Sequence, residues 1–95
     1  MDGVHTIFTC DQFPVQAEGE VDGDKFYFRA RHGEWSFGIA SNPADDPVDV
    51  HLGMAEGYLE EGEYDDTGYV TLDEAQQWID AGAKAYRAWK TRAWR

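Results

Sequence analysis

Carboxylates are the side chains of this chain most able to do chemistry. Residues 45–80 contain twelve Asp and Glu residues and no Lys or Arg. Carboxylates on one face of a strand recur every ~6.6 Å, so a folded acidic surface can offer regularly spaced charge to a protein that grips phosphates. Such a field repels nucleic acid and acidic membranes and attracts basic surfaces. Solubility is the other explanation of these charges, and it stays open.

The candidate partner-binding residues are the acids that we expect in loops and at strand edges, together with two tyrosines that would supply apolar contact at the centre of an interface. They are Asp45, Asp46, Glu60, Glu61, Glu63, Asp65, Asp66, Tyr58 and Tyr64. Carboxylates at these positions could pair with the Lys and Arg side chains that otherwise hold phosphates. The sequence therefore predicts an acidic protein that binds the basic nucleic-acid-binding surface of another protein.

One stretch matches a metal-ligand pattern. Residues 63–74 place oxygen donors at positions 1, 3, 5, 9 and 12 of an EF-hand loop, with glycine at position 6. Against calcium, position 1 holds Glu where Asp is expected, and the glycine-rich segment before it is a poor helix. Calcium binding is the alternative function, and an acidic turn into a capped helix is the other interpretation. The alternative ligand set is Glu63, Asp65, Thr67, Tyr69 and Glu74.

No catalytic signature accompanies these acids. The chain has no Ser-His-Asp order, HExxH, CxxC or phosphate-binding glycine loop, and its three His residues are scattered. We therefore predict a non-enzymatic protein without catalytic residues or a cofactor. The single Cys10 cannot form an internal disulfide, and no stretch approaches 18 apolar residues. We expect a cytoplasmic protein that does not bind a membrane.

The elements that must position these acids centre on residues 25–40, KFYFRARHGEWSFGIA. Apolar residues alternate with polar ones on both sides of His32-Gly33, which suits a two-residue turn with positive φ. This loop sets Phe28 opposite Phe37 and makes Arg31 and Glu34 an ion pair. A slip of one residue would turn every aromatic ring to water.

A second hairpin precedes the first one in the chain. Residues 15–21 alternate in the same way, and Asp22-Gly23 is a strong hairpin signal. Pairing across it sets Ala17 opposite Phe28, so both turns agree on one register and predict a three-stranded meander over residues 15–40. Its outer face carries acids around Arg29 and Arg31, which indicates a cross-strand charge ladder, with an anion-binding pair as the alternative.

The remaining strands are less clearly marked. We expect a short strand at residues 6–10 that ends near Phe13-Pro14, and a strand at 58–64 followed by a turn at 65–68. Val48, Val50 and Leu52 alternate with Asp49 and His51, which predicts one more strand between the meander and the strand at 58–64.

The C-terminal part predicts a helix over residues 72–92. Thr71 and Glu74 match a capping box, and apolar residues then recur at spacings of three and four. The basic residues at its end suit the helix dipole. Trp78, Ala85 and Trp94 extend its apolar surface, which indicates a wider contact with the sheet or a homodimer seam.

These elements predict one α+β domain over residues 1–95. An antiparallel sheet of four or five strands should carry the C-terminal helix on its aromatic face. The expected core is Phe26, Phe28, Trp35, Phe37, Ile39, Leu72, Ile79, Tyr86 and Trp89.

The string KFYFRARHGEWSFGIA, followed by GEYDDTGY and LDEA before a terminal helix, resembles small proteins carried by bacterial phages and mobile elements. Anti-CRISPR proteins are among them. The resemblance implies a short, acidic, non-enzymatic inhibitor that occupies the nucleic-acid-binding surface of a CRISPR effector subunit. It assigns no individual residue a role, because these proteins share no sequence motif.

Overall fold

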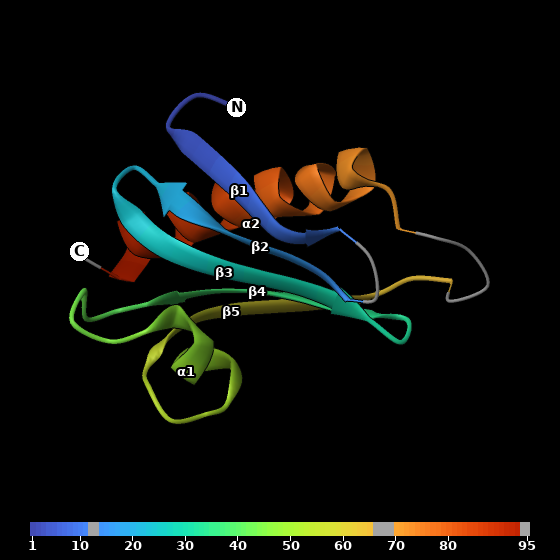
Figure 1. The fold of residues 1–95 in the computed structure, drawn as a ribbon. Helices are drawn as coiled ribbons and strands as arrows, with labels where there is room; N and C mark the ends of the chain where they lie inside the picture. Colours follow the sequence, from blue (N-terminus) through green and yellow to red (C-terminus); the bar gives the residue numbers. More distant parts are fainter. Residues whose placement is uncertain (12–13, 66–69, 94–95) are drawn as a thin grey trace.

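In the described part of the computed structural model, five antiparallel strands form one sheet in the order β1-β2-β3-β4-β5, and two helices lie against it (Figure 1). The structure describes residues 1–11, 14–65 and 70–93. The elements are β1 (Val4–Asp11), β2 (Val15–Val21), β3 (Asp24–Arg31), β4 (Glu34–Ala40), α1 (Pro47–His51), β5 (Gly57–Glu63) and α2 (Leu72–Ala93). The predicted α+β fold, with a C-terminal helix on an antiparallel sheet, is confirmed.

Both predicted hairpins have the expected register. Ala17 pairs with Phe28 across the first turn, and Phe28 pairs with Phe37 across the second. Asp22 and His32 have φ values of 53° and 55°, and a glycine with positive φ follows each of them. Two successive positive φ values give a turn whose twist matches that of the strands. The turn residues and the apolar alternation therefore determined the same meander.

The outer strands extend this meander on both sides. β1 pairs with β2 over a longer range than the expected residues 6–10, with a register shift between Phe8 and Cys10. β5 pairs with β4, so that Glu61 lies beside Ser36 and Glu63 beside Glu34. The turn expected at 65–68 lies mostly outside the described residues.

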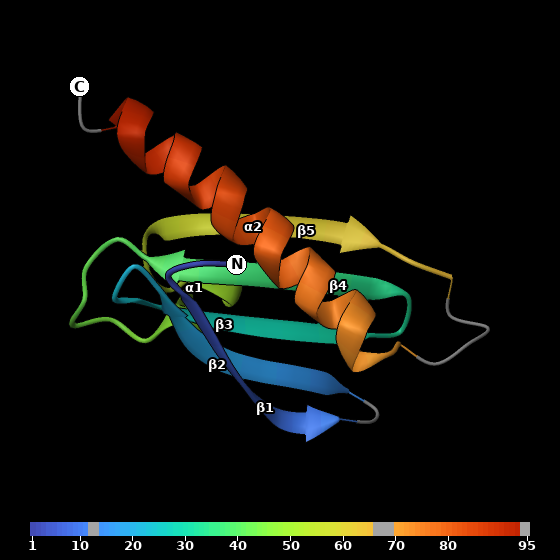
Figure 2. The same cartoon turned by 90° about the horizontal axis from the view of Figure 1, so that it is seen from above.

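Helix α2 crosses one face of the sheet obliquely, as Figure 2 shows. The Glu74 amide donates to Thr71 Oγ1 at 3.1 Å, and the Thr71 amide donates to Glu74 Oε1 at 3.3 Å, so the capping box is confirmed. A methyl group on Gly82 would lie 2.7 Å from the Phe37 ring, so glycine at this position lets helix and sheet approach closely.

The core lies between α2 and the sheet. Its buried residues are Val15, Ala17, Val21, Phe26, Phe28, Ala30, Phe37, Ile39, Ala75, Ile79, Ala83 and Tyr86. Trp35 and Trp89 pack at its margin, as half-buried residues. Leu72 was wrongly expected in the core, because it is the first residue of α2 and is 41% exposed. Val70, just before the helix, packs against the core instead.

Trp78 belongs to this aromatic layer rather than to a free helix surface. Its ring stacks on Trp35 with 5.8 Å between centroids, and it also contacts Phe28 and Tyr64. The interpretation as a wider contact with the sheet is therefore correct for Trp78. Trp94, the other tryptophan considered for a homodimer seam, lies outside the described residues.

The prediction of a strand at residues 48–52 is wrong, because this segment forms α1. Asp46 caps the helix by accepting the Val48 amide at 3.0 Å, and Pro47 occupies its first turn. Proline suits that position, since its missing amide hydrogen would have no partner in the helix. The apolar spacing at Val48 and Val50 resembled a strand because five residues are too few to distinguish the two-residue period of a strand from the 3.6-residue period of a helix.

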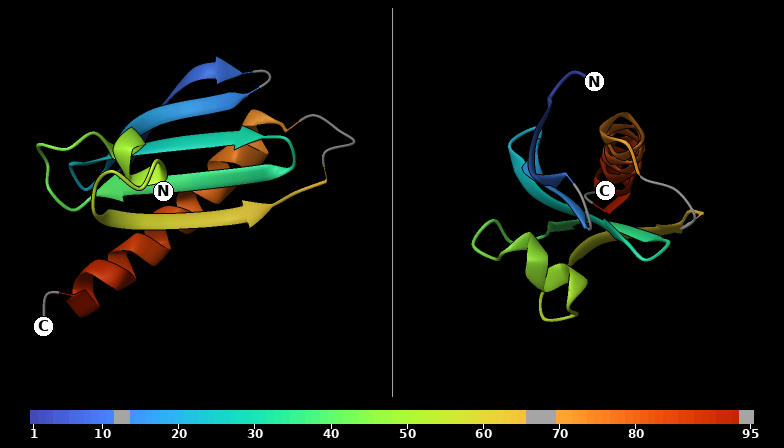
Figure 3. Two further views of the ribbon diagram at one scale, coloured as in Figure 1. Left: turned by 90° about the horizontal axis from the view of Figure 1, so that it is seen from below. Right: turned by 45° about the vertical axis from the view of Figure 1, so that its right-hand side comes forward.

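Helices α1 and α2 lie on opposite faces of the sheet, as the right panel of Figure 3 shows. In the part of the chain that the structure describes, no helix is long and apolar enough to cross a membrane.

Candidate partner-binding face

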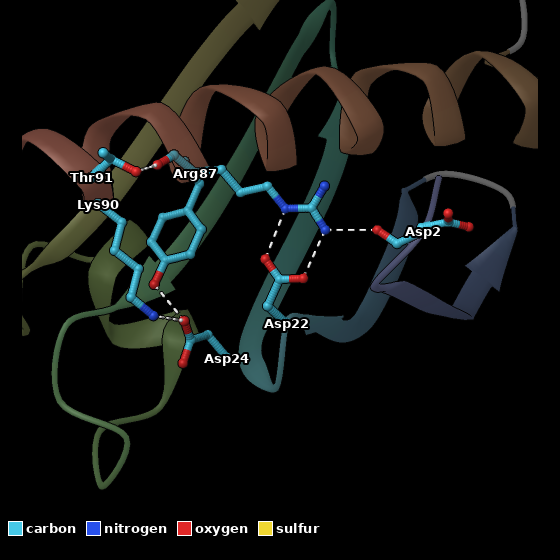
Figure 4. Close-up of polar contacts among 7 residues, drawn as sticks. Asp2, Asp22, Asp24, Arg87, Lys90 and Thr91 are labelled. Atoms are coloured by element: carbon cyan, nitrogen blue, oxygen red, sulfur yellow. Dashed lines mark hydrogen bonds and ion pairs between the residues drawn. The ribbon is translucent and has the colours of Figure 1, made fainter.

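Two aspartates of the β2–β3 hairpin bind basic residues of α2 (Figure 4). Arg87 pairs with Asp22 through two hydrogen bonds of 2.8 Å, and Lys90 pairs with Asp24 at 2.7 Å. Tyr86 also donates to Asp24, at 2.7 Å. Part of the basic end of α2 thus has specific partners in the sheet, beyond the favourable interaction with the helix dipole that the sequence suggested.

These contacts shift the pKa of both carboxyl groups downward. The Arg87 hydrogen bond is the main cause of the lowered pKa of Asp22. Burial would raise the pKa of Asp24, but the hydrogen bonds from Lys90 and Tyr86 outweigh it and leave the pKa below 3.8. Both groups are therefore ionised at neutral pH and are neutralised within the molecule.

His51 holds α1 on the opposite face of the sheet. Its Nε2 donates to the Tyr27 carbonyl oxygen at 3.1 Å, since a carbonyl can only accept, and its Nδ1 lies 2.9 Å from Ser36 Oγ. The Tyr27 ring packs edge-on against the imidazole at 5.0 Å. Burial lowers the pKa of His51 below 6.5, although the bond to Tyr27 opposes this shift. The neutral imidazole is therefore the form that fits between helix and sheet.

We call this side of the molecule the α1-side face: the surface of the sheet opposite α2, together with α1 and the loop before it. Its acids are Glu18, Glu20, Glu34, Asp45, Asp46, Asp49, Glu61 and Glu63, and its basic residues are Lys25, Arg29 and Arg31. None of these acids forms an ion pair among the described residues, since the two ion pairs found there lie at α2. The face therefore keeps an excess of negative charge that the fold does not neutralise, although Asp46 also caps α1.

The ion pair expected between Arg31 and Glu34 does not form. The two residues are register partners at the β3–β4 turn, as predicted. However, Arg31 Nε donates to the neighbouring His32 Nε2 at 2.7 Å, and the side chains of Arg31 and Glu34 are both exposed to solvent. An exposed pair gains little from closing, because water screens it and both side chains lose conformational freedom. Glu34 is left as one of the unneutralised acids.

The candidate acids of β5 lie on two different faces. Glu61 and Glu63 alternate with Glu60, and Glu60 pairs with Phe37, whose side chain points into the core beneath α2. Successive side chains of a strand point to opposite sides of the sheet. Glu61 and Glu63 therefore belong to the α1-side face, whereas the half-buried Glu60 lies on the α2 side and accepts a hydrogen bond from Tyr58 at 3.0 Å.

The two candidate tyrosines pack against α2. Tyr58 lies 5.8 Å from Tyr86 and 5.6 Å from Trp89 between ring centroids, and Tyr64 lies 5.5 Å from Trp78. Burial, together with the bond to Glu60, raises the pKa of Tyr58 to about 12. Both rings are half-buried at the margin of the core, so a large part of their apolar surface already supports the fold.

The loop acids Asp45 and Asp46 line a groove of about 580 Å³ on the α1-side face. The opposite wall comes from β2 with Glu18 and Glu20, and Lys25 of β3 also lines it. The groove was not predicted, because the loop meets the sheet only through the docking of α1. Asp65 is exposed, and Asp66 lies outside the described residues.

The structure describes residues 63–65 and 70–74 of the stretch that matches a calcium-binding loop. The segment before it is strand β5, whereas an EF-hand loop follows a helix. Glu74 is engaged in the capping box with Thr71. No group of three or more potential metal ligands occurs among the described residues, and Thr67 and Tyr69 lie outside them. Calcium binding at this stretch therefore stays a prediction.

Sequence reasoning missed the role of His51, although one signal was present. Gly38 lies in the middle of a strand, where glycine is unfavourable unless another group approaches the backbone closely. A methyl group at Gly38 would lie 2.7 Å from His51 Nε2. The glycine marks the docking position of α1, but it does not reveal which segment docks there.

Comparison of the chain with protein family models, with curated proteins and with solved structures finds no match.

Proposed function

We propose that this chain is a non-catalytic binding protein whose α1-side face docks onto the basic nucleic-acid-binding surface of another protein. The observation that carries the proposal is the excess of unpaired acids on the α1-side face. Asp22 and Asp24 at α2 have basic partners, whereas the acids of the α1-side face form no ion pair among the described residues. Unneutralised like charges on a folded surface repel one another and destabilise the fold, so this arrangement favours a function that uses them.

The mechanism would be competition with nucleic acid. Lys and Arg side chains that bind phosphates would instead pair with carboxylates of the α1-side face. The overall formal charge of −11 would steer the encounter and make association fast. Because salt screens this attraction, affinity should fall steeply as ionic strength rises.

An anti-CRISPR inhibitor is the most concrete form of this proposal. Its partner would be a CRISPR effector subunit with a basic channel for guide RNA or target DNA. The sequence resemblance and the acidic α1-side face support this form. Any other basic nucleic-acid-binding protein would offer the same chemistry, so the partner has to be found by experiment.

The test begins with capture of a partner from nuclease-treated bacterial lysate and its identification by mass spectrometry. The purified partner is then loaded with fluorescent nucleic acid, and displacement by this protein is followed by anisotropy. We expect displacement that weakens with salt. The triple variant Glu18→Gln, Asp45→Asn and Glu61→Gln should weaken displacement by roughly tenfold or more, since it removes three charges from the α1-side face.

The matched control removes three charges from the other side of the molecule. It consists of Glu60→Gln in β5 with Asp73→Asn and Asp80→Asn in α2, and it should change displacement by less than about threefold. Equal weakening in both triple variants would mean that net charge, rather than the α1-side face, is responsible. A captured protein that keeps its nucleic acid at low salt would contradict competition altogether.

A further inference from the structure

The groove on the α1-side face is lined by apolar as well as acidic side chains. Ile7 of β1 is 70% exposed, although it is a large apolar residue. It shares the groove with Tyr27 of β3 and with Pro47 and Val48 of α1. The volume of about 580 Å³ lies within the range of sites that bury a small ligand or a side chain.

The two walls carry charge of the same sign. Glu18 and Glu20 stand on the β2 side, and Asp45 and Asp46 stand on the loop side. The only Lys or Arg that lines the groove is Lys25, and it forms no ion pair among the described residues. The groove therefore suits a ligand that is both cationic and partly apolar.

We propose that this groove holds an arginine side chain of the basic partner. The guanidinium would lie between the acidic walls, with its methylene stem on the apolar side chains that line the groove. Arginine fits better than lysine because its planar group is weakly hydrated, packs on aromatic rings such as Tyr27, and binds carboxylates through two hydrogen bonds. This inference rests on the proposed function and names the part of the surface that recognises the partner.

The probe is a short peptide of alternating arginine and serine, titrated into the ¹⁵N-labelled protein of residues 1–95 at low salt. Its control is the same peptide with citrulline, an uncharged isostere, at each arginine. We expect the arginine peptide to shift the amide signals of Ile7, Glu18, Tyr27 and Val48, and the citrulline peptide to leave them unchanged. A peptide with lysine in place of arginine should bind several-fold more weakly.

Four variants test which residues contribute to binding of the arginine peptide. Glu18→Gln with Asp45→Asn should weaken peptide binding by about tenfold, whereas Glu61→Gln with Glu63→Gln, outside the groove, should weaken it by less than about twofold. Ile7→Ser should weaken binding without lowering the melting temperature, because the residue is exposed. Lys25→Gln should strengthen binding, since it removes the competing positive charge of the lysine.

The groove and the proposed function can fail separately. Signal shifts centred on Glu61 and Glu63, equal weakening by both double variants, or equal binding of the arginine and lysine peptides would overturn the groove assignment. Displacement of nucleic acid from a partner could still succeed in that case. Conversely, a peptide seated in the groove with no displacement would leave the groove in place and remove the proposed competition.

Discussion

A helix covers each face of the sheet, but the two contacts have different chemistry. On the α2 side the close approach is made by a glycine of the helix, since Gly82 faces the Phe37 ring. On the α1 side it is made by a glycine of the sheet, since Gly38 faces the His51 imidazole. The first contact is apolar and wide, whereas the second centres on one polar ring with two hydrogen bonds, beside the buried Pro47 and Val50.

The difference separates stability from recognition. The α2 side contains the aromatic core and the two ion pairs found among the described residues, so the basic end of its helix is tied to the sheet. The α1 side buries little apolar surface, with Pro47 and Val50 as the buried residues of its helix, and leaves its acids unpaired. Changes on the α2 side should therefore act mainly on folding, and changes on the α1 side mainly on binding.

The largest expected effect is that of Phe28→Ala. Phe28 is fully buried between β2, β4 and the α2 aromatics, so the variant loses its transfer free energy and leaves a cavity. The free energy of unfolding should fall by about 3–5 kcal/mol, measured by urea denaturation.

The matched change on the other face is Leu59→Ala in β5. Leu59 is 37% exposed and lies on the α1 side, so this substitution should lower the free energy of unfolding by less than about 1 kcal/mol. Similar losses for the two variants would show that the α1-side face supports the fold as much as the core does, and the separation would be wrong.

The second prediction compares the two glycines. In Gly82→Ala the new methyl group would lie 2.7 Å from Cδ1 and 2.9 Å from Cγ of Phe37, whose ring is fully buried and cannot move aside. The gain in helix propensity does not offset this overlap, and we expect a net loss of roughly 1–3 kcal/mol in urea denaturation. Ala88→Gly, at an exposed position of α2, controls for the change in propensity alone.

Gly38→Ala should have a smaller effect, of about 1 kcal/mol, because α1 can lift from the sheet without opening the core. The new methyl group would meet His51 Nε2 at 2.7 Å and Cδ2 at 3.0 Å. Loss of the His51 contact can be followed by the NMR signals of Ser36 and Tyr27. A Gly38→Ala protein that unfolds as easily as Gly82→Ala would mean that α1 docking is part of the cooperative core.

The meander was predictable because its determinants are local. Asp22-Gly23 and His32-Gly33 fix two turns, and the alternation of apolar residues fixes which side faces the core. A register slip would expose Phe26, Phe28 and Phe37 together, so one arrangement is strongly favoured. The same local logic identified α2 through its capping box.

The candidate site was less predictable because it depends on contacts between distant residues. The acids of β5 were grouped as one surface, although the strand period places Glu60 apart from Glu61 and Glu63. The groove needs α1 to dock, and docking depends on His51 meeting Ser36 and Tyr27 across 15 and 24 residues. Asp46-Pro47 is a local signal for the start of a helix, but the apolar alternation of residues 48–52 favoured a strand instead.

The smallest predicted effect is a pH dependence of stability that comes from the α1 side. Burial lowers the pKa of His51 in the folded state below 6.5, so the fold favours the neutral ring. Above 6.5 the ring is neutral in both states and its contribution to stability is constant. Between 6.5 and the folded pKa, the unfolded chain binds a proton that the folded chain does not, so stability falls with falling pH. Asp22 and Asp24, with pKa values below 3.8, do not titrate in this window.

Urea denaturation at about pH 7.5 and about pH 5.5 should therefore show a lower free energy of unfolding at the acidic pH. His51→Gln should flatten this dependence, and Gly38→Ala should do the same, because it moves the ring away from Tyr27 and Ser36. His32→Asn is the matched control: it removes an exposed histidine at a turn position with positive φ that asparagine tolerates, and it should keep the dependence. If His32→Asn flattens the dependence while His51→Gln keeps it, the imidazole of α1 is not the group that distinguishes the two faces. If both His51→Gln and Gly38→Ala flatten it, protonation of the His51 imidazole weakens the polar contact of α1 with the sheet. The contact of α2 with the sheet is apolar and does not depend on this proton.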